Sequence, residues 1–239
     1  MNNYEVKAYD EVQAWRLKIM RPGRMINRIS KRAQNKINSW IPEKAHRIIT
    51  ESIKNMVKAT LFGSDLTTKR RMNTNRPLYE MDEQVKAKQI VYRRTATVEG
   101  AGTGAGGIFL GLADFPLLLS IKLKFLFEVA SIYGFDTGKY EERLFILHIF
   151  QLAFSNDEKR RETLFIIENW EEQKEKLIDM DWRSFQQEYR DYIDLVKMLQ
   201  LIPGFGAIVG AYANYNLIDE LAETAINVYR MRILEQKYS

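Results

Sequence analysis

Cysteine is absent from the 239 residues of this chain. This absence excludes disulfide bonds, thiolate metal ligands and cysteine nucleophiles, and it favours a cytoplasmic protein. Histidine is scarce too, with only His46 and His148. The chain contains no HExxH, GxSxG or GxxxxGK[ST] motif. Without a catalytic signature or a metal-ligand spacing, the sequence favours a non-enzymatic protein with no metal and no cofactor.

Strand-like alternation is scarce as well, and apolar residues recur at helical spacing along most of the chain. We predict an all-α fold: a single compact multi-helix domain with two glycine-rich apolar helical segments in its core. Within it we expect a basic N-terminal helical region over residues 1–62, a polar loop over 63–78 and a glycine-rich helical core over 79–239. Together these parts form one structural domain.

Three of the expected helices have recognisable ends or faces. Asp114 is predicted to cap a helix that carries Pro116 in its first turn and is stopped by Gly134. Residues 141–154 are apolar nearly all round, which predicts a buried helix. A charged helix is expected from the SND sequence at 155–157 to about Leu177.

Glycine is concentrated in two tracts. One contains the letters GxGxxG, but no strand precedes it and no βαβ pattern follows, so it is not a dinucleotide-binding loop. Small residues four apart leave a groove in which a second helix can approach closely. We therefore expect helix packing at the following positions, although a flexible loop over residues 100–107 remains an alternative: Gly102, Gly106, Gly107, Gly111, Gly206 and Gly210.

The chain has no uninterrupted apolar run that reads simply as a membrane span. Residues 198–218 carry no charge but include Pro203 and two asparagines, and residues 100–121 are interrupted by Asp114. An acidic residue at mid-membrane costs about 2.5–3.5 kcal/mol. We predict a buried hairpin of a soluble or peripheral protein, and an integral membrane hairpin or a shallow insertion stays open.

Acidic residues are few in the first part of the chain. Residues 1–99 carry 21 Lys and Arg against 10 Asp and Glu, whereas the remainder carries 15 against 21. Residues 16–47 alone hold ten Lys and Arg and one acid. Such a stretch can lie on anionic lipid, or it can be a core-facing helix with a solvated basic back. No DNA- or RNA-binding motif accompanies the charge, so nucleic acid is not expected as a partner. The predicted membrane-surface contacts are Arg21, Arg24, Arg28, Lys31 and Arg32.

A few polar residues interrupt the apolar segments. Asp114, His148, Asn214 and Asp219 are candidates for a polar pocket, although His148 fits a satisfied core histidine better than a ligand. If they converge, the chain would be a soluble helical enzyme or a carrier of a lipid-like small molecule, with its cavity near Asp114 and His148.

Three stretches together resemble the EcsC family. They are WIPEKAHRIITESI, the block GAGTGAGGIFLGLADFPLLLSIKLKFLFEVASIYGFD with EERLFILHIF, and IPGFGAIVGAYANYNLIDELAETAINVYRMR. This family is named for a bacterial gene beside those of an ABC transporter linked to secretion and cell-envelope processes. The resemblance implies a helical accessory protein at the cytoplasmic face of the membrane, with an ABC transporter as a partner, and the basic stretch adds anionic lipid as a second expected partner. It assigns no catalytic residue and no oligomeric state.

Overall fold

The computed structural model describes residues 1–21, 43–63, 76–103, 108–155, 157–180, 189 and 209–238, with side chains left out at some helix ends. Eight α-helices form these parts of the chain, and the all-α prediction is confirmed. They are α1 (Asn3–Met20), α3 (Glu43–Phe62), α4 (Leu78–Thr103), α5 (Ile108–Ile132), α6 (Tyr140–Phe154), α7 (Asp157–Glu168), α8 (Trp170–Asp179) and α11 (Val209–Tyr238).

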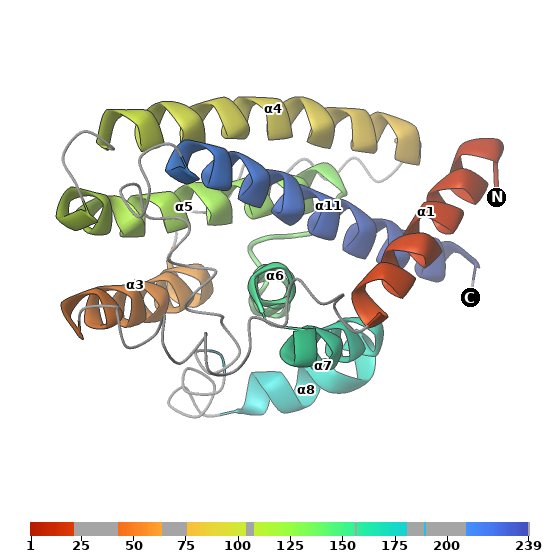
Figure 1. Cartoon of the computed structure of the whole chain (residues 1–239). Coiled ribbons are helices and arrows are strands. Elements are labelled where there is room, and N and C mark those ends of the chain that lie inside the picture. Colours follow the sequence, from red (N-terminus) through yellow and green to blue (C-terminus); the bar gives the residue numbers. More distant parts are fainter. Residues whose placement is uncertain are drawn as a thin grey trace.

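The long helices α4, α5 and α11 pack side by side, and α6 runs beneath them through the middle of the molecule (Figure 1). α3 packs on α5 and α6, while α7 and α8 cover another side of α6. α1 crosses the C-terminal part of α11. The central position of α6 explains why its sequence has no polar face.

Polar contacts fix the direction in which α1 and α11 pair. Lys237 contacts Glu5 at 2.6 Å, and Lys18 contacts Glu223 at 2.8 Å. From Glu5 to Lys18 the residue number rises along α1, whereas their partners on α11 fall from Lys237 to Glu223, so the two helices are antiparallel. The Glu5 carboxylate also completes the capping box of α1 with Asn2 and accepts from the Tyr238 hydroxyl at 2.7 Å. The hydrogen bond from Lys237 is the main reason that the pKa of Glu5 is lowered to about 2.

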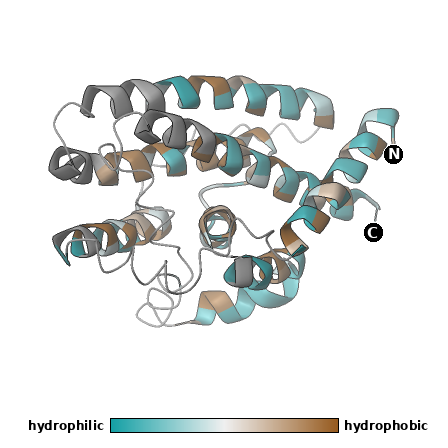
Figure 2. Cartoon of the chain, viewed as in Figure 1, coloured by the Kyte–Doolittle hydropathy of each residue, from teal (hydrophilic) through white to brown (hydrophobic). Residues whose placement is uncertain are grey.

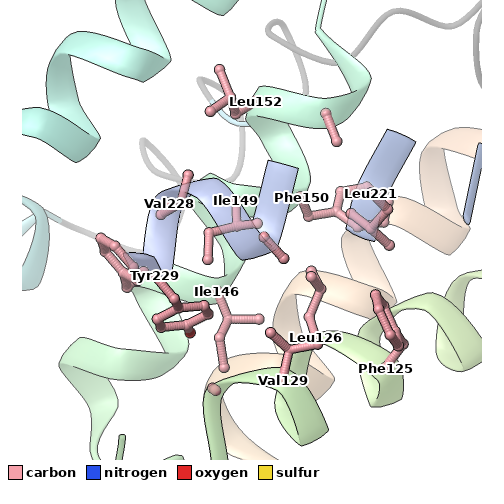
Figure 3. Close-up of a cluster of buried hydrophobic side chains, with 14 of the residues drawn as sticks. Phe125, Leu126, Val129, Ile146, Ile149, Phe150, Leu152, Leu221, Val228 and Tyr229 are labelled. Carbon is pink, nitrogen blue, oxygen red and sulfur yellow. The ribbon is translucent and has the colours of Figure 1, made fainter. Parts of the chain in front are cut away.

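The core is one cluster to which α1, α3, α4, α5, α6, α7 and α11 all contribute apolar side chains. Figure 3 shows its centre, where Ile146, Ile149 and Phe150 of α6 meet side chains of α5 and α11. Each fully buried aliphatic or aromatic side chain of this kind contributes about 1.5–3 kcal/mol. The predicted buried helix over 141–154 is confirmed as α6, in which twelve of fifteen residues are buried.

The expected N-cap at Asp114 is wrong, because α5 already begins at Ile108. Pro116 therefore lies inside the helix, where its ring leaves one backbone hydrogen bond unmade at a cost of about 3 kcal/mol. The fully buried side chains Phe115 and Leu118 flank it and offset this cost by packing. The predicted stop is confirmed: α5 ends at Ile132, and Gly134 adopts a φ of 91°, which L side chains rarely reach.

The charged segment expected as one helix is two. α7 ends at Glu168 and α8 begins at Trp170, with Asn169 between them outside helical geometry at φ −108° and ψ 35°. The Asn169 side chain donates to the Phe165 carbonyl at 2.8 Å and so satisfies an acceptor at the end of α7. The break turns Trp170 onto the core, where its ring packs edge-on against Phe145 at 4.9 Å.

Candidate functional site

A carboxylate, Asp82, lies in the middle of the apolar side of α4. Its neighbours on the same helix face, Leu78 and Val85, are both core residues, and Asp82 itself is fully buried. An ionised carboxylate in such a position must be paired and hydrogen-bonded. Asp82 is not among the candidate residues predicted from the sequence, although an acid on an otherwise apolar stripe is a signal that could have identified it.

Side chains from three other helices satisfy Asp82. The Tyr133 hydroxyl at the end of α5 donates to Oδ1 at 2.5 Å, and the Tyr4 hydroxyl of α1 donates to Oδ2 at 2.6 Å. Arg230 of α11 donates to Oδ2 through Nε at 2.9 Å. Its Nη2 also lies 2.9 Å from Oδ2, and its Nη1 donates to Glu11 of α1 at 2.6 Å. The contacts of Asp82 thus connect α1, α4, α5 and α11.

Burial and the Asp82 carboxylate shift the pKa values of the side chains around Asp82. Burial and the neighbouring carboxylate raise the pKa of Tyr4 to about 12, and they raise the pKa of Tyr133 well above its ordinary value. Burial disfavours the charged form of Arg230, but Asp82 and Glu11 outweigh it and raise the pKa of this guanidinium. Both tyrosines are therefore protonated donors and Arg230 is a permanent cation at neutral pH.

A second buried carboxylate, Glu142, lies in the first turn of α6. It accepts from the Tyr229 hydroxyl at 2.8 Å and pairs with Arg232 at 2.6 Å, and its own pKa is raised by burial. The rings of Tyr229 and Tyr133 stack at 5.4 Å, so the two clusters touch. The Arg232 guanidinium also lies over the Phe135 ring at 4.2 Å. Arg230 and Arg232 are two residues apart on α11, so they point to different sides of the helix, one toward Asp82 and the other toward Glu142.

These two clusters are suited to joining helices rather than to catalysis. Asp82 is fully buried, and each of its oxygens already accepts a donor. In the part of the chain that the structure describes, no group of three or more acidic or histidine side chains is placed to hold a metal ion. The oxygens of both buried carboxylates, Asp82 and Glu142, are therefore already occupied by contacts between helices.

Two cavities lie elsewhere, on either side of the C-terminal part of α11. One of about 190 Å³ lies against α1 and is lined by Tyr9, Gln13 and Tyr238, among others. The other, of about 300 Å³, lies against the α7–α8 junction, where Trp170 and Arg232 contribute to its wall. Neither cavity is lined by His148 or Asp219, which were expected to share a polar pocket.

The structure places those expected pocket residues as follows. His148 is a buried core residue on α6, and its Nδ1 donates to the Leu144 carbonyl at 2.8 Å. Asp219 of α11 accepts from Gln89 at 2.6 Å and pairs with Arg93 at 3.6 Å, so it holds α11 to α4. The side chains of Asp114 and Asn214 lie outside the described residues. The common polar pocket stays a prediction.

The glycine and basic positions are described only in part. The backbone is helical at Gly102, Gly111 and Gly210, which lie on α4, α5 and α11. Gly106, Gly107 and Gly206 lie outside the described residues, and the expected glycine packing remains untested. Arg21 is exposed at the C-cap of α1. The other predicted lipid contacts, Arg24, Arg28, Lys31 and Arg32, fall outside the described ranges as well.

Burial of His148 predicts a specific pH dependence of stability. Desolvation lowers the pKa of His148 from 6.5 to about 4 in the folded chain. Between these two pH values the imidazole is protonated in the unfolded chain and neutral in the folded chain. The stability that depends on a neutral His148 is therefore fully present above pH 6.5 and is lost as the pH falls toward 4. His148→Gln removes this titration. Between pH 6.5 and 4 we expect its free energy of unfolding, measured by urea titration, to rise relative to that of the parent by up to about 3 kcal/mol. Parallel curves for the variant and the parent from pH 8 to 4 would contradict the assignment.

Among the helices of the described ranges, none combines the length and the apolar composition needed to cross a membrane. α5, which contains part of the first candidate span, also carries Lys122, Lys124 and Glu128. The second candidate span, residues 198–218, lies largely outside the described residues.

The family model of the EcsC protein family matches residues 6–234. This chain belongs to the EcsC protein family. It is 51% identical to "Protein EcsC" of Bacillus subtilis (strain 168) over 226 residues, which cover 95% of this chain and 94% of that protein. It is 33% identical to "Uncharacterized protein YdbA" of the same organism over 165 residues, which cover 67% of this chain and 61% of that protein. No solved structure matches the chain.

Two of the three stretches that carry the EcsC resemblance meet at the two buried carboxylates. Tyr133 belongs to the YGFD sequence, Glu142 belongs to EERLF, and Tyr229, Arg230 and Arg232 belong to NVYRMR. Their contacts with one another and with Asp82 join α4, α5, α6 and α11. In this EcsC-family chain, these motif residues act together as an interior framework.

Proposed function

We propose that this EcsC-family chain is a non-enzymatic accessory protein that associates peripherally with the cytoplasmic face of the membrane, close to an ABC transporter. The observation that carries the lipid part is the charge division, with 21 Lys and Arg against 10 Asp and Glu in residues 1–99. Anionic lipid attracts clustered basic residues with about 1 kcal/mol for each residue near the surface.

The end of α1 supports this proposal from the described side chains. Leu17 and Met20 are exposed to 60% and 51%, and Arg21 follows them as the helix ends. Exposed aliphatic side chains beside cations are typical of segments that lie in the membrane interface. The basic stretch expected to contact lipid continues directly from this point in the sequence.

Flotation with protein-free vesicles tests the lipid contact. The parent protein is expected to float with vesicles rich in phosphatidylglycerol at low salt and to be released as salt screens the charges. Reversal of Arg24, Arg28, Lys31 and Arg32 to glutamate is expected to weaken binding at least tenfold, because four attractions become repulsions.

A matched control reverses four cations on and near α6–α8 instead: Lys139, Arg161, Lys174 and Lys176. This control changes the net charge equally and is expected to float almost as well as the parent. Equal losses in both variants would show a nonspecific response to net charge, and a parent protein that never floats would refute the lipid proposal.

The transporter part of the proposal rests on the family resemblance. Purification of the tagged protein from gently solubilised membranes is expected to recover the subunits of an ABC transporter. Recovery of the protein without any transporter subunit, at equal expression and under conditions that keep the transporter intact, would contradict this part alone.

A further inference from the structure

α4 and α5 form an antiparallel pair whose outward side is defined by direct contacts. Lys88 of α4 pairs with Glu128 of α5 at 2.8 Å, and the Tyr92 hydroxyl donates to the same carboxylate at 2.8 Å. The Tyr92 and Phe125 rings pack at 5.4 Å just inside this contact. The Lys88–Glu128 pair therefore marks the line along which the two helices meet solvent.

Aliphatic side chains continue this line toward the glycine-rich ends of both helices. On α4, Val91 lies three residues after Lys88. On α5, Lys124 lies four residues before Glu128, and Leu117 lies seven residues before Lys124. Residues three, four or seven apart share one face of a helix. Val91 is 57% exposed and Leu117 is 51% exposed, with Ile90 also exposed beside Val91. Figure 2 shows hydrophobic segments in both helices.

Two cations accompany these aliphatic side chains. Arg94 is exposed one turn after Ile90 and Val91, and Lys124 is exposed one turn before Glu128. Of the acids on this side, Glu83 pairs with Lys86 and Glu128 pairs with Lys88. Arg94 and Lys124 form no ion pair with any residue that the structure describes. We call the set Ile90, Val91, Arg94, Leu117 and Lys124 the hairpin collar.

Beyond the collar, three helix ends gather that carry almost no charge. Residues 96–103 of α4 and 108–114 of α5 contain only Glu99 and Asp114 as charged residues, and residues 209–216 of α11 contain none. Figure 1 shows these ends of α4, α5 and α11 at the same side of the molecule. A group of helix ends with few charged residues, bordered by exposed aliphatic residues and cations, matches the layering of a membrane interface.

We propose that the hairpin collar lies in the headgroup layer of an anionic bilayer, with Val91 and Leu117 in contact with acyl chains and Arg94 and Lys124 in contact with lipid phosphates. This inference rests on the proposed peripheral membrane association and adds a second contact face to it. Charge complementarity favours lipid as the occupant. Among the residues that the structure describes, no acid pairs with Arg94 or Lys124, and Val91 and Leu117 are about half exposed.

The absence of cysteine makes a direct test possible. Single variants Val91→Cys and Leu117→Cys, each labelled with an environment-sensitive fluorophore, are mixed with vesicles of phosphatidylglycerol and phosphatidylcholine. We expect at least a twofold rise in emission with a blue shift at both positions. The matched control is Phe165→Cys on α7, a side chain that is 59% exposed, and it is expected to show no comparable change.

A second measurement uses charge. Arg94→Glu with Lys124→Glu is expected to weaken flotation at least fivefold, while Lys54→Glu with Lys58→Glu, two exposed cations on α3, is expected to leave it within twofold of the parent. Circular dichroism of every variant checks that the helices remain.

The outcomes separate this inference from the proposed function. If the parent floats but the labels at 91 and 117 report no apolar environment, the collar proposal is overturned and membrane association stands. The labels could instead respond to detergent-solubilised membrane proteins and not to protein-free vesicles. That result would identify a protein-docking face and would also overturn the collar proposal. A parent that does not float removes the proposed lipid contact itself.

Discussion

Replacement of Arg230 with methionine is expected to lower the free energy of unfolding by about 3–5 kcal/mol. Methionine fills much of the space of the aliphatic stem, but it leaves the fully buried Asp82 carboxylate without its cation. The hydroxyls of Tyr4 and Tyr133 still donate to Asp82, yet neither supplies positive charge. Urea unfolding followed by circular dichroism, with an unchanged m value, measures the effect.

Two further variants show whether the charge pair is the cause. Arg161→Met removes an exposed guanidinium on α7 and is expected to change the stability by less than about 0.5 kcal/mol. Asp82→Asn combined with Arg230→Met is expected to lose less than the sum of the two single changes, because a neutral amide needs no counter-ion. Simple additivity of the two changes would show that the contact contributes nothing as a pair.

Phe150→Ala is expected to destabilise the chain by about 3–5 kcal/mol. Phe150 is fully buried at the centre of α6, its ring lies 4.5 Å from that of Phe154, and it points toward Leu221 of α11 (Figure 3). Truncation there opens a cavity between α6 and α11, and helices held by so many other contacts close it only in part. Thermal and urea unfolding measure the loss.

The matched control for this core position is Phe165→Ala on α7. Phe165 is 59% exposed, so its truncation is expected to cost less than about 0.5 kcal/mol. Phe150→Leu keeps most of the buried volume and should fall between the two. A Phe150→Ala variant as stable as the parent would mean that the described core is not packed around α6.

The helices were predictable from the sequence because each depends on its own residues. Apolar residues all round 141–154 predicted a buried helix, and Gly134 predicted the end of α5 through its freedom at positive φ. The errors arose where neighbouring residues outweighed a local signal. Pro116 is tolerated inside α5 because buried residues on both sides hold the helix, and Asn169 breaks a charged segment because Trp170 has a core site to fill.

The candidate site was less predictable, because it is made of pairs that are distant in sequence. Asp82 and Arg230 are 148 residues apart, and Glu142 and Arg232 are 90 apart. A lone charge on an apolar stripe indicates that a partner must exist, but it does not say which of many oppositely charged residues it is. His148, a pocket candidate that fitted a core histidine better than a ligand, lies buried on α6, where its Nδ1 donates to the Leu144 carbonyl.

By itself, the amino-acid sequence determined the all-α class, the membership in the EcsC protein family and the division into a basic front and an acidic remainder. These properties depend on local periodicity, on extended similarity and on composition, none of which needs a partner in space. Only the tertiary structure decided that Asp82 and Glu142 contact arginines and tyrosines from other helices, and that Val91 and Leu117 are exposed. Burial and ion pairing are properties of two surfaces brought together, so they exist only once the helices have packed.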